Sequence, residues 1–136
     1  MNTANERPHK KLKVWQKAMG LVTSIYKMTA QFPKEEEFGL KAQLRRAAVS
    51  VPSNIAEGLA RQTKPDKLRF LNMSQASLSE IDTQIEITRQ LEYLDDDRYA
   101  RIMSDILDVQ MLLSGLTRSI RQKQRFTVYD LRFTNF

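Results

Sequence analysis

The sequence has no cysteine, a single histidine, and only four glycines and four prolines in 136 residues. Without cysteine there is no disulfide framework and no thiolate metal site, which suits the cytoplasm. The shortage of glycine and proline favours long helices joined by short loops. No stretch approaches the roughly 18 apolar residues of a membrane-spanning helix. We therefore expect one soluble, cytoplasmic, all-α domain with no membrane span.

The residues of a catalytic or metal site are equally scarce. Nucleophilic catalysis would need a base beside Ser50 or Ser53, and the only histidine, His9, lies in the N-terminal tail. The four glycines are scattered and form no phosphate-binding loop. The acidic clusters at 35–37 and 95–97 are consecutive, so their side chains fan outward and do not converge on a metal ion. We predict no enzyme activity, no cofactor, no metal and no small-molecule substrate.

The net charge of +6 is distributed unevenly. Residues 1–34 carry seven basic residues and one acid, and residues 98–136 carry seven basic residues and three acids. Residues 65–97 carry three basic residues and eight acids. Basic first and last segments could bind nucleic-acid phosphates. Alternatively, basic and acidic helices attract each other within the domain or between subunits.

Apolar residues recur at helical spacing in four stretches. We expect helices over about 12–31, 39–61 and 65–91, and a fourth that has Asp95 or Asp96 as its N-cap. In the first helix, two apolar rows predict a wide buried face; they are Leu12, Trp15, Met19, Val22 and Tyr26, and Ala18, Leu21, Ile25, Met28 and Phe32. Trp15 could stack on a base, but its spacing favours the core. The fourth helix has the most regular row: Tyr99, Ile102, Ile106, Val109, Leu113, Leu116 and Ile120.

The predicted organisation is a disordered basic tail over 1–11, a four-helix domain over 12–124 and a C-terminal tail over 125–136. The last twelve residues break the helical period and alternate aromatic with basic side chains. Such a tail could stack on RNA bases, dock onto another subunit or stay loose; we favour docking or disorder.

Pro52 interrupts the pattern of the second stretch. It lacks an amide donor and crowds the carbonyl of Ala48, but the helical phase continues beyond it, which predicts one kinked helix. Asn54 and Glu57 have the spacing of a capping box, so a restart at Asn54 is the alternative.

Beside the apolar face of this stretch runs a polar stripe at the same period, made of Gln43, Arg46, Ser50, Asn54, Glu57 and Arg61. We predict that the stripe is a structural hydrogen-bond network, in which Arg46 pairs with Glu57 or with an acid of the third helix. The alternative is a phosphate-facing row led by Arg45, Arg46 and Arg61, although Glu57 would repel phosphate.

Three segments carry a family resemblance: LKVWQKAM at 12–19, QLRRAAVSVPSNIAEG at 43–58 and FLNMSQASLSEIDTQI at 70–85. They resemble the four-helix-bundle proteins encoded in 23S rRNA intervening sequences and, more distantly, the accessory proteins of diversity-generating retroelements. The resemblance covers about residues 12–122. It implies an antiparallel up-down bundle, assembly into a ring-shaped homo-pentamer, and RNA or nucleoprotein partners.

Charge and resemblance together predict a non-enzymatic RNA-binding accessory protein associated with 23S rRNA intervening sequences. The predicted nucleic-acid contacts are Lys10, Lys11, Lys13, Lys17, Arg45, Arg61, Arg118, Arg121, Lys123 and Arg125. The alternative is a protein-interaction scaffold that recruits an acidic protein or a nucleoprotein enzyme such as a reverse transcriptase.

Overall fold

The computed structural model describes residues 7–123 of the chain. Its elements are a 3-10 turn η2 (Pro8–Lys11), helix α1 (Lys13–Thr29), a 3-10 turn η3 (Lys34–Glu36), and helices α2 (Leu40–Ala60), α3 (Lys64–Gln90) and α4 (Asp96–Gln122). Residues 7–123 contain no strand. The predicted all-α fold with four helices is therefore confirmed.

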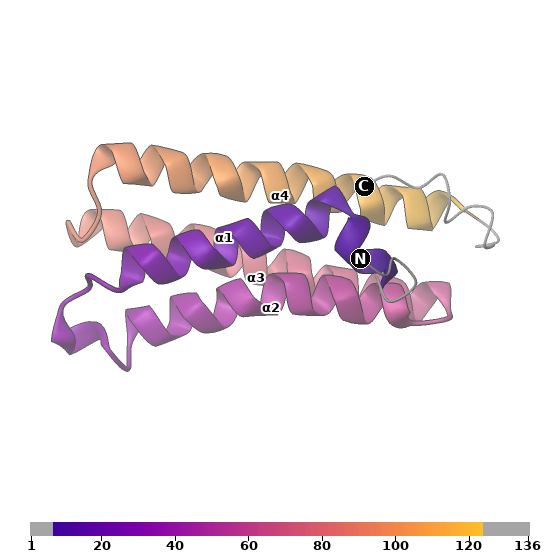
Figure 1. The fold of residues 1–136 in the computed structure, drawn as a ribbon, viewed down its shortest axis with the longest axis horizontal. Helices are drawn as coiled ribbons and strands as arrows, with labels where there is room; N and C mark the ends of the chain where they lie inside the picture. The colour runs from indigo at the N-terminus through magenta and orange to yellow at the C-terminus, as the bar shows by residue number, and fades with distance from the viewer. Residues whose placement is uncertain (1–6, 124–136) are drawn as a thin grey trace, which may run out of the picture.

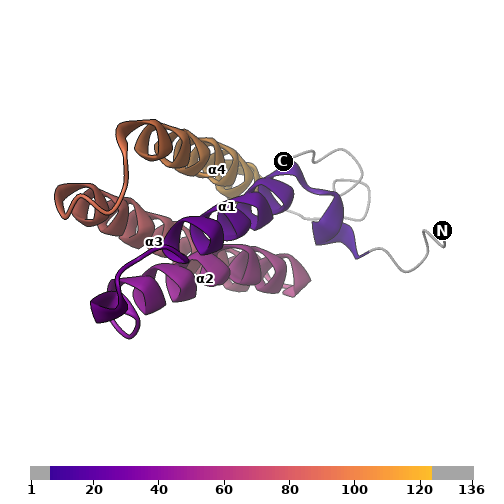
Figure 2. The same ribbon diagram turned by 60° about the vertical axis from the view of Figure 1, so that its left-hand side comes forward.

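The four helices lie side by side, with α1 between α2 and α4 and with α3 on the far side (Figures 1 and 2). Successive helices run in opposite directions (Figure 1).

At one end of the bundle, the ring of Tyr93 lies 5.5 Å from that of Phe32, which joins the α3–α4 connection to the end of α1. At the other end, Lys64 Nζ donates to the Lys123 carbonyl at 2.9 Å. These contacts connect both ends of the bundle.

One hydrophobic core fills the space between the helices. The predicted row of α4 is buried from Ile102 to Ile120, whereas the two rows of α1 differ. Ala18, Leu21, Ile25, Met28 and Phe32 are buried. Met19 and Tyr26 of the other row are 41% and 40% exposed, and Trp15 packs against the core half-buried. Because Val14 is fully buried as well, the buried face of α1 is narrower and lies further round the helix than predicted.

The N-terminal segment differs from the prediction over residues 8–11. Instead of belonging to a disordered tail, these residues form η2, which packs against α1 and α2. Pro8 favours the turn because its φ is already set to a helical value. Gln16 Nε2 then donates to the Lys10 carbonyl at 2.9 Å, and the ring of His9 meets that of Trp15 edge to face at 5.3 Å. His9 is therefore not a freely solvated residue.

Helix α2 continues through Pro52 as one helix, so it does not restart at Asn54. A kink at Pro52 stays a prediction. Near the end of α2, α3 approaches closely because Gly58 has no side chain. A Cβ atom at Gly58 would lie 3.1 Å from the carbonyl oxygen of Lys67. None of the helices described is long and apolar enough to cross a membrane.

Candidate nucleic-acid interface

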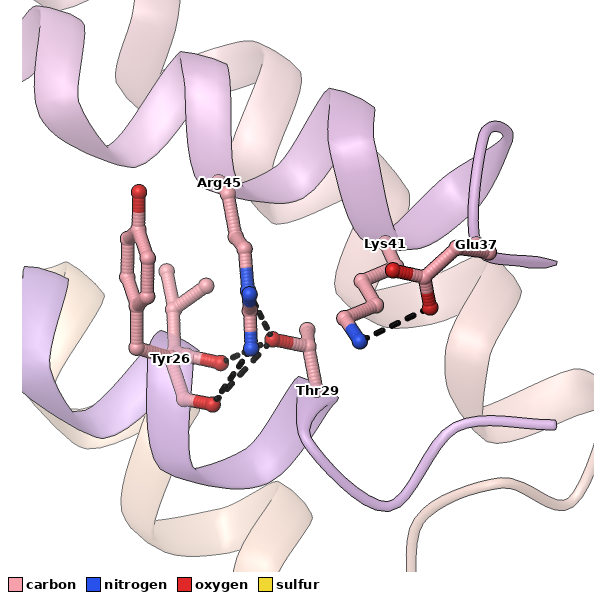
Figure 3. A network of polar contacts seen from close by, with 6 residues as sticks. Tyr26, Thr29, Glu37, Lys41 and Arg45 are labelled. Carbon is pink, nitrogen blue, oxygen red and sulfur yellow. Dashed lines mark hydrogen bonds and ion pairs between the residues drawn. The ribbon is translucent and has the colours of Figure 1, made fainter. Parts of the chain in front are cut away.

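Arg45, one of the predicted nucleic-acid contacts, binds the carboxyl end of α1. Its Nε donates to Thr29 Oγ1 at 2.9 Å and its Nη2 donates to the Tyr26 carbonyl at 3.1 Å (Figure 3). The guanidinium also lies over the Tyr26 ring, 4.4 Å from its centroid. The Tyr26 carbonyl already accepts a hydrogen bond from Ala30 N at 3.1 Å, so the arginine adds a charged donor to it near the negative end of the helix dipole. The donors of Arg45 are thus directed into the fold.

Two lysines of α3 bind helix carboxyl ends in the same way. Lys67 Nζ donates to the Leu59 carbonyl of α2 at 3.3 Å, and burial lowers the pKa of this lysine. Lys64 Nζ donates to the carbonyls of Arg121 and Lys123 at the end of α4, at 2.5 and 2.9 Å. Three of the four helices therefore have their carboxyl ends bound by a cation from a neighbouring helix.

Arg61, the other contact predicted on the second helix, also has partners within the fold. Its Nη2 donates to Glu57 Oε1 at 2.9 Å, and its guanidinium lies over the Phe70 ring at 4.6 Å. This pairing corrects the expectation that Glu57 binds Arg46. Residues 46 and 57 are separated by about 16 Å along a helix, at 1.5 Å per residue. Arg46 is exposed and forms no ion pair within residues 7–123.

The middle of the polar stripe lies between α2 and α3. Asn54 Nδ2 donates to the carbonyl and the hydroxyl of Ser50, at 2.9 and 2.8 Å. The Ser50 hydroxyl shares a hydrogen bond with that of Ser77 on α3 at 2.8 Å. Gln43, at the start of the stripe, is exposed. Ser50 and Asn54 thus connect two helices, while Gln43 and Arg46 face solvent.

The predicted basic residues of the two chain ends lie on separate surfaces. Lys13 and Lys17 line a groove between α1 and α4, whereas Arg118 and Arg121 line a cavity between α3 and α4. Lys10 and Lys11 belong to η2 and are exposed, and Lys123 follows the end of α4. Arg125 lies outside the described residues. The structure therefore does not join all of these residues into one surface.

A basic groove lies between α1 and α4. Two neighbouring cavities of about 380 and 340 Å³ form it, and they share Ser24 and Asp105. Its basic lining residues are Lys13, Lys17, Lys27, Arg98 and Arg101. Asp105 is the one acid among the lining residues. We call this surface the α1/α4 groove.

The cations of the α1/α4 groove are largely free of protein partners. Arg98 Nε lies 3.8 Å from Asp95 Oδ2, and both side chains are largely exposed. The other four basic residues have no ion pair within the part of the chain that the structure describes. Five positive charges on the walls of a concave surface, facing one carboxylate, produce a positive potential that attracts polyanions. No aromatic side chain lines the groove.

Lys27, Arg98 and Arg101 are members of this surface that the sequence prediction missed. The sequence does contain a pattern that could have identified them, namely a row of polar residues at helical spacing on each of the two helices. Residues 13, 17, 20, 24 and 27 of α1, and residue 31 just beyond its end, recur at intervals of three or four and are polar or glycine. On α4, residues 98, 101 and 105 do the same. Two such rows meet when the helices pack in opposite directions.

No group of three or more acidic or histidine side chains within residues 7–123 could hold a metal ion. The α1/α4 groove has other chemistry: its lining combines positive charge with the side chains of Gln16, Ser24 and Gln31, which can donate hydrogen bonds. This chemistry matches phosphate oxygens.

Comparisons with known proteins give a consistent result. The family described as 23S rRNA-intervening sequence protein matches residues 10–115. A crystal structure of a protein of unknown function from the S23 ribosomal protein family of Bacteroides thetaiotaomicron superposes with a TM-score of 0.72. That protein is 24% identical, and the match covers 77% of this chain and 95% of that one, so the likeness shows the fold alone. The comparison with curated proteins found no match.

Proposed function

The chain belongs to the 23S rRNA-intervening sequence protein family, and from that premise we propose that it is a non-enzymatic, cytoplasmic RNA-binding accessory protein. The observation that carries the proposal is the α1/α4 groove, with five basic side chains and one acid in its lining. RNA phosphates that bind these cations release their condensed counterions, which drives association. We propose that the RNA backbone binds in this groove.

The groove is proposed to bind the backbone without selecting a base sequence. Lysine and arginine bind phosphate groups, whereas sequence selection requires contacts with base edges or stacking on aromatic rings. Because the lining contains no aromatic ring, we expect similar affinities for RNAs that differ in sequence but share a fold.

Assembly is the second element of the proposal. We propose a homo-oligomer, with the pentamer implied by the family resemblance as the expected form. Met19, Tyr26 and Val49, exposed by 40 or 41% on α1 and α2, support a contact between copies. The mass of the assembly in solution, measured by light scattering or native mass spectrometry, tests this element. A monomer at micromolar concentration would contradict it.

A protein scaffold is the second candidate. A groove that has charge but no aromatic lining suits any polyanion, including an acidic protein or a nucleoprotein enzyme such as a reverse transcriptase. A candidate protein that stays bound after nuclease treatment supports the scaffold. One that is released by nuclease supports the RNA-binding reading.

The decisive experiment compares the RNA affinity of a variant with two charge reversals in the groove with that of a variant with two charge reversals outside it. The double variant Lys27→Glu with Arg101→Glu alters the groove. Arg46→Glu with Arg69→Glu makes the same change in net charge on exposed sites of α2 and α3. Binding to a structured 23S rRNA fragment is then measured by fluorescence anisotropy at several salt concentrations.

We expect the groove variant to bind at least tenfold more weakly and the matched variant to lose no more than about threefold. Loss of two phosphate contacts should also reduce the slope of log affinity against log salt by about 1.5, since each contact contributes roughly 0.7 to 0.9. Equal losses in the two variants would show that overall charge, and not the groove, binds the RNA. Absence of binding by the unmodified chain at low salt would remove the RNA-binding function.

A further inference from the structure

A second groove lies between α3 and α4. One cavity of about 300 Å³ is lined by Asn72, Gln75, Ser114, Thr117, Arg118 and Arg121. A neighbouring cavity of about 480 Å³ shares Gln75 and Ser114 and extends to Leu107, Gln110 and Met111. We call the two together the α3/α4 groove. It follows α4 from near its carboxyl end toward its middle.

The α3/α4 groove exposes apolar side chains that the bundle core does not cover. Leu107 is 56% exposed and Met111 is 69% exposed, and the two are one helical turn apart on α4. Neighbouring exposed side chains of this size mark a surface that contacts another segment or another protein.

A polar atom in the same groove also lacks a partner. Gln75 Oε1 is buried and accepts no hydrogen bond within residues 7–123. Buried acceptors of this kind are normally satisfied, because an unpaired buried acceptor has lost its hydrogen bonds to water without replacement. Because Gln75 lines both cavities of the groove, a turn of its amide would let this oxygen accept from a donor on a segment that lies over the groove.

We propose that residues 124–136 of the same chain turn back and cover the α3/α4 groove. The described chain ends at Lys123, two residues after Arg121, which lines the near end of the groove. The segment therefore starts where the groove starts. Six of its thirteen residues are large and apolar: Phe126, Val128, Tyr129, Leu131, Phe133 and Phe136.

The segment is long enough to reach the exposed pair Leu107 and Met111. Met111 precedes Lys123 by twelve residues, or about 18 Å of helix at 1.5 Å per residue. An extended segment advances about 3.3 Å per residue, so five or six residues after a two-residue turn reach Met111. That count brings Leu131 beside Met111, and Phe133 beside Leu107 one helical turn further along.

The sequence of the segment supplies a matching face. Tyr129, Leu131 and Phe133 alternate with polar or charged residues. In an extended segment, alternate side chains point to the same side. One side of the segment can therefore cover Leu107 and Met111 while Asp130 and Arg132 face solvent.

The absence of native cysteine allows a direct test in the full-length chain. The pair Met111→Cys with Leu131→Cys places one thiol in the α3/α4 groove and one on the segment. The control pair is Lys17→Cys with Leu131→Cys, since Lys17 lines the groove on the other side of α4. Disulfide formation under mild oxidation is followed by non-reducing electrophoresis and intact mass.

We expect the Met111 pair to form a disulfide within one chain at least tenfold faster than the control pair. Equal rates in the two pairs would overturn the proposal. A disulfide that joins two chains would also overturn it, because the occupant of the groove would then be a segment from another copy.

A second readout uses the methionine itself. With the segment in place, peroxide should oxidise Met111 more slowly than in a full-length variant that carries Leu131→Ser and Phe133→Ser. We expect the variant to oxidise Met111 at least threefold faster. Met73, which is 46% exposed on α3, serves as the internal control and should react at the same rate in both chains. Equal rates at Met111 would contradict the docking.

Discussion

Arg45 Nε donates to Thr29 Oγ1 at 2.9 Å, so a side chain of α2 closes the carboxyl end of α1. Replacing Arg45 with Met should lower the free energy of unfolding by about 1–2 kcal/mol, because two hydrogen bonds and a cation–π contact are lost. RNA affinity should change no more than about twofold. Arg46→Met is the matched control and should change stability by less than about 0.5 kcal/mol, because Arg46 is exposed and has no ion pair among the residues that the structure describes. Urea unfolding measures both; equal effects would show that the contact contributes nothing.

Replacement by alanine should have opposite effects on stability at Gly58 and at Gly20. Gly58→Ala should lower the free energy of unfolding by about 1–3 kcal/mol, since the new Cβ would lie 3.1 Å from the Lys67 carbonyl oxygen and 3.2 Å from Phe70 Cβ. Gly20→Ala should raise it by about 0.5–1 kcal/mol, because alanine is the better helix former and nothing lies within 4 Å of the added atom. Thermal unfolding of the two variants provides the measurement. Stabilisation by Gly58→Ala would show that α3 can move away at little cost.

Glu92 has a φ of 63°, the left-handed conformation that ends many helices and favours glycine. The closing hydrogen bonds run from Glu92 N to the Arg89 carbonyl at 2.9 Å and from Tyr93 N to the Thr88 carbonyl at 3.1 Å. Glu92→Gly should therefore raise the free energy of unfolding by about 0.5–1 kcal/mol, since the strain of a side chain in this conformation is relieved. Gln90→Gly, within the last turn of α3, should lower it by a similar amount. Stabilisation by both variants, or by neither, would contradict this account.

The pKa of His9 is lowered by burial and, to a smaller degree, by the charges of Lys10 and Arg7. The folded chain therefore favours the neutral imidazole. This contribution to stability is present above the unfolded pKa of 6.5 and is lost as the pH falls through the lower folded value. Because His9 is the only histidine, its proton NMR signals give the titration directly. We expect a midpoint below 6.5 that moves toward 6.5 in Trp15→Leu, which removes the ring contact; a midpoint at or above 6.5 in the unmodified chain would contradict the prediction.

The helices were predictable because their spacing is regular. The row from Ile102 to Ile120 keeps one period and is buried throughout. Asp95, one of the two predicted caps of the fourth helix, accepts a hydrogen bond from Arg98 N at 2.8 Å. The buried face of α1 was less predictable, because two apolar rows compete and the packing of α2 and α4 determines which one enters the core.

The candidate groove was predicted only in part, through Lys13 and Lys17. A count of charges along the chain draws attention to the basic residues near its two ends, and so it overlooks Lys27 and Arg101. These two residues share a surface only because α1 and α4 pack together. Arg45 presents the reverse problem. Its partners Tyr26 and Thr29 precede it by 19 and 16 residues, so local spacing gives no sign that its donors are used within the fold. Residue type predicts charge, whereas tertiary contacts determine whether that charge is available.

The cations at the helix carboxyl ends have a consequence for how the bundle opens. Arg45, Lys67 and Lys64 each bind the end of a helix other than their own. The ends of α1, α2 and α4 therefore cannot fray without breaking an interhelical contact, and their amides should exchange with solvent mainly through cooperative unfolding. The carboxyl end of α3 differs, because within residues 7–123 it is closed by its own backbone bonds at Glu92 and Tyr93 and is joined to the end of α1 through the ring of Tyr93, without a cation from another helix. Local opening of the bundle should begin there.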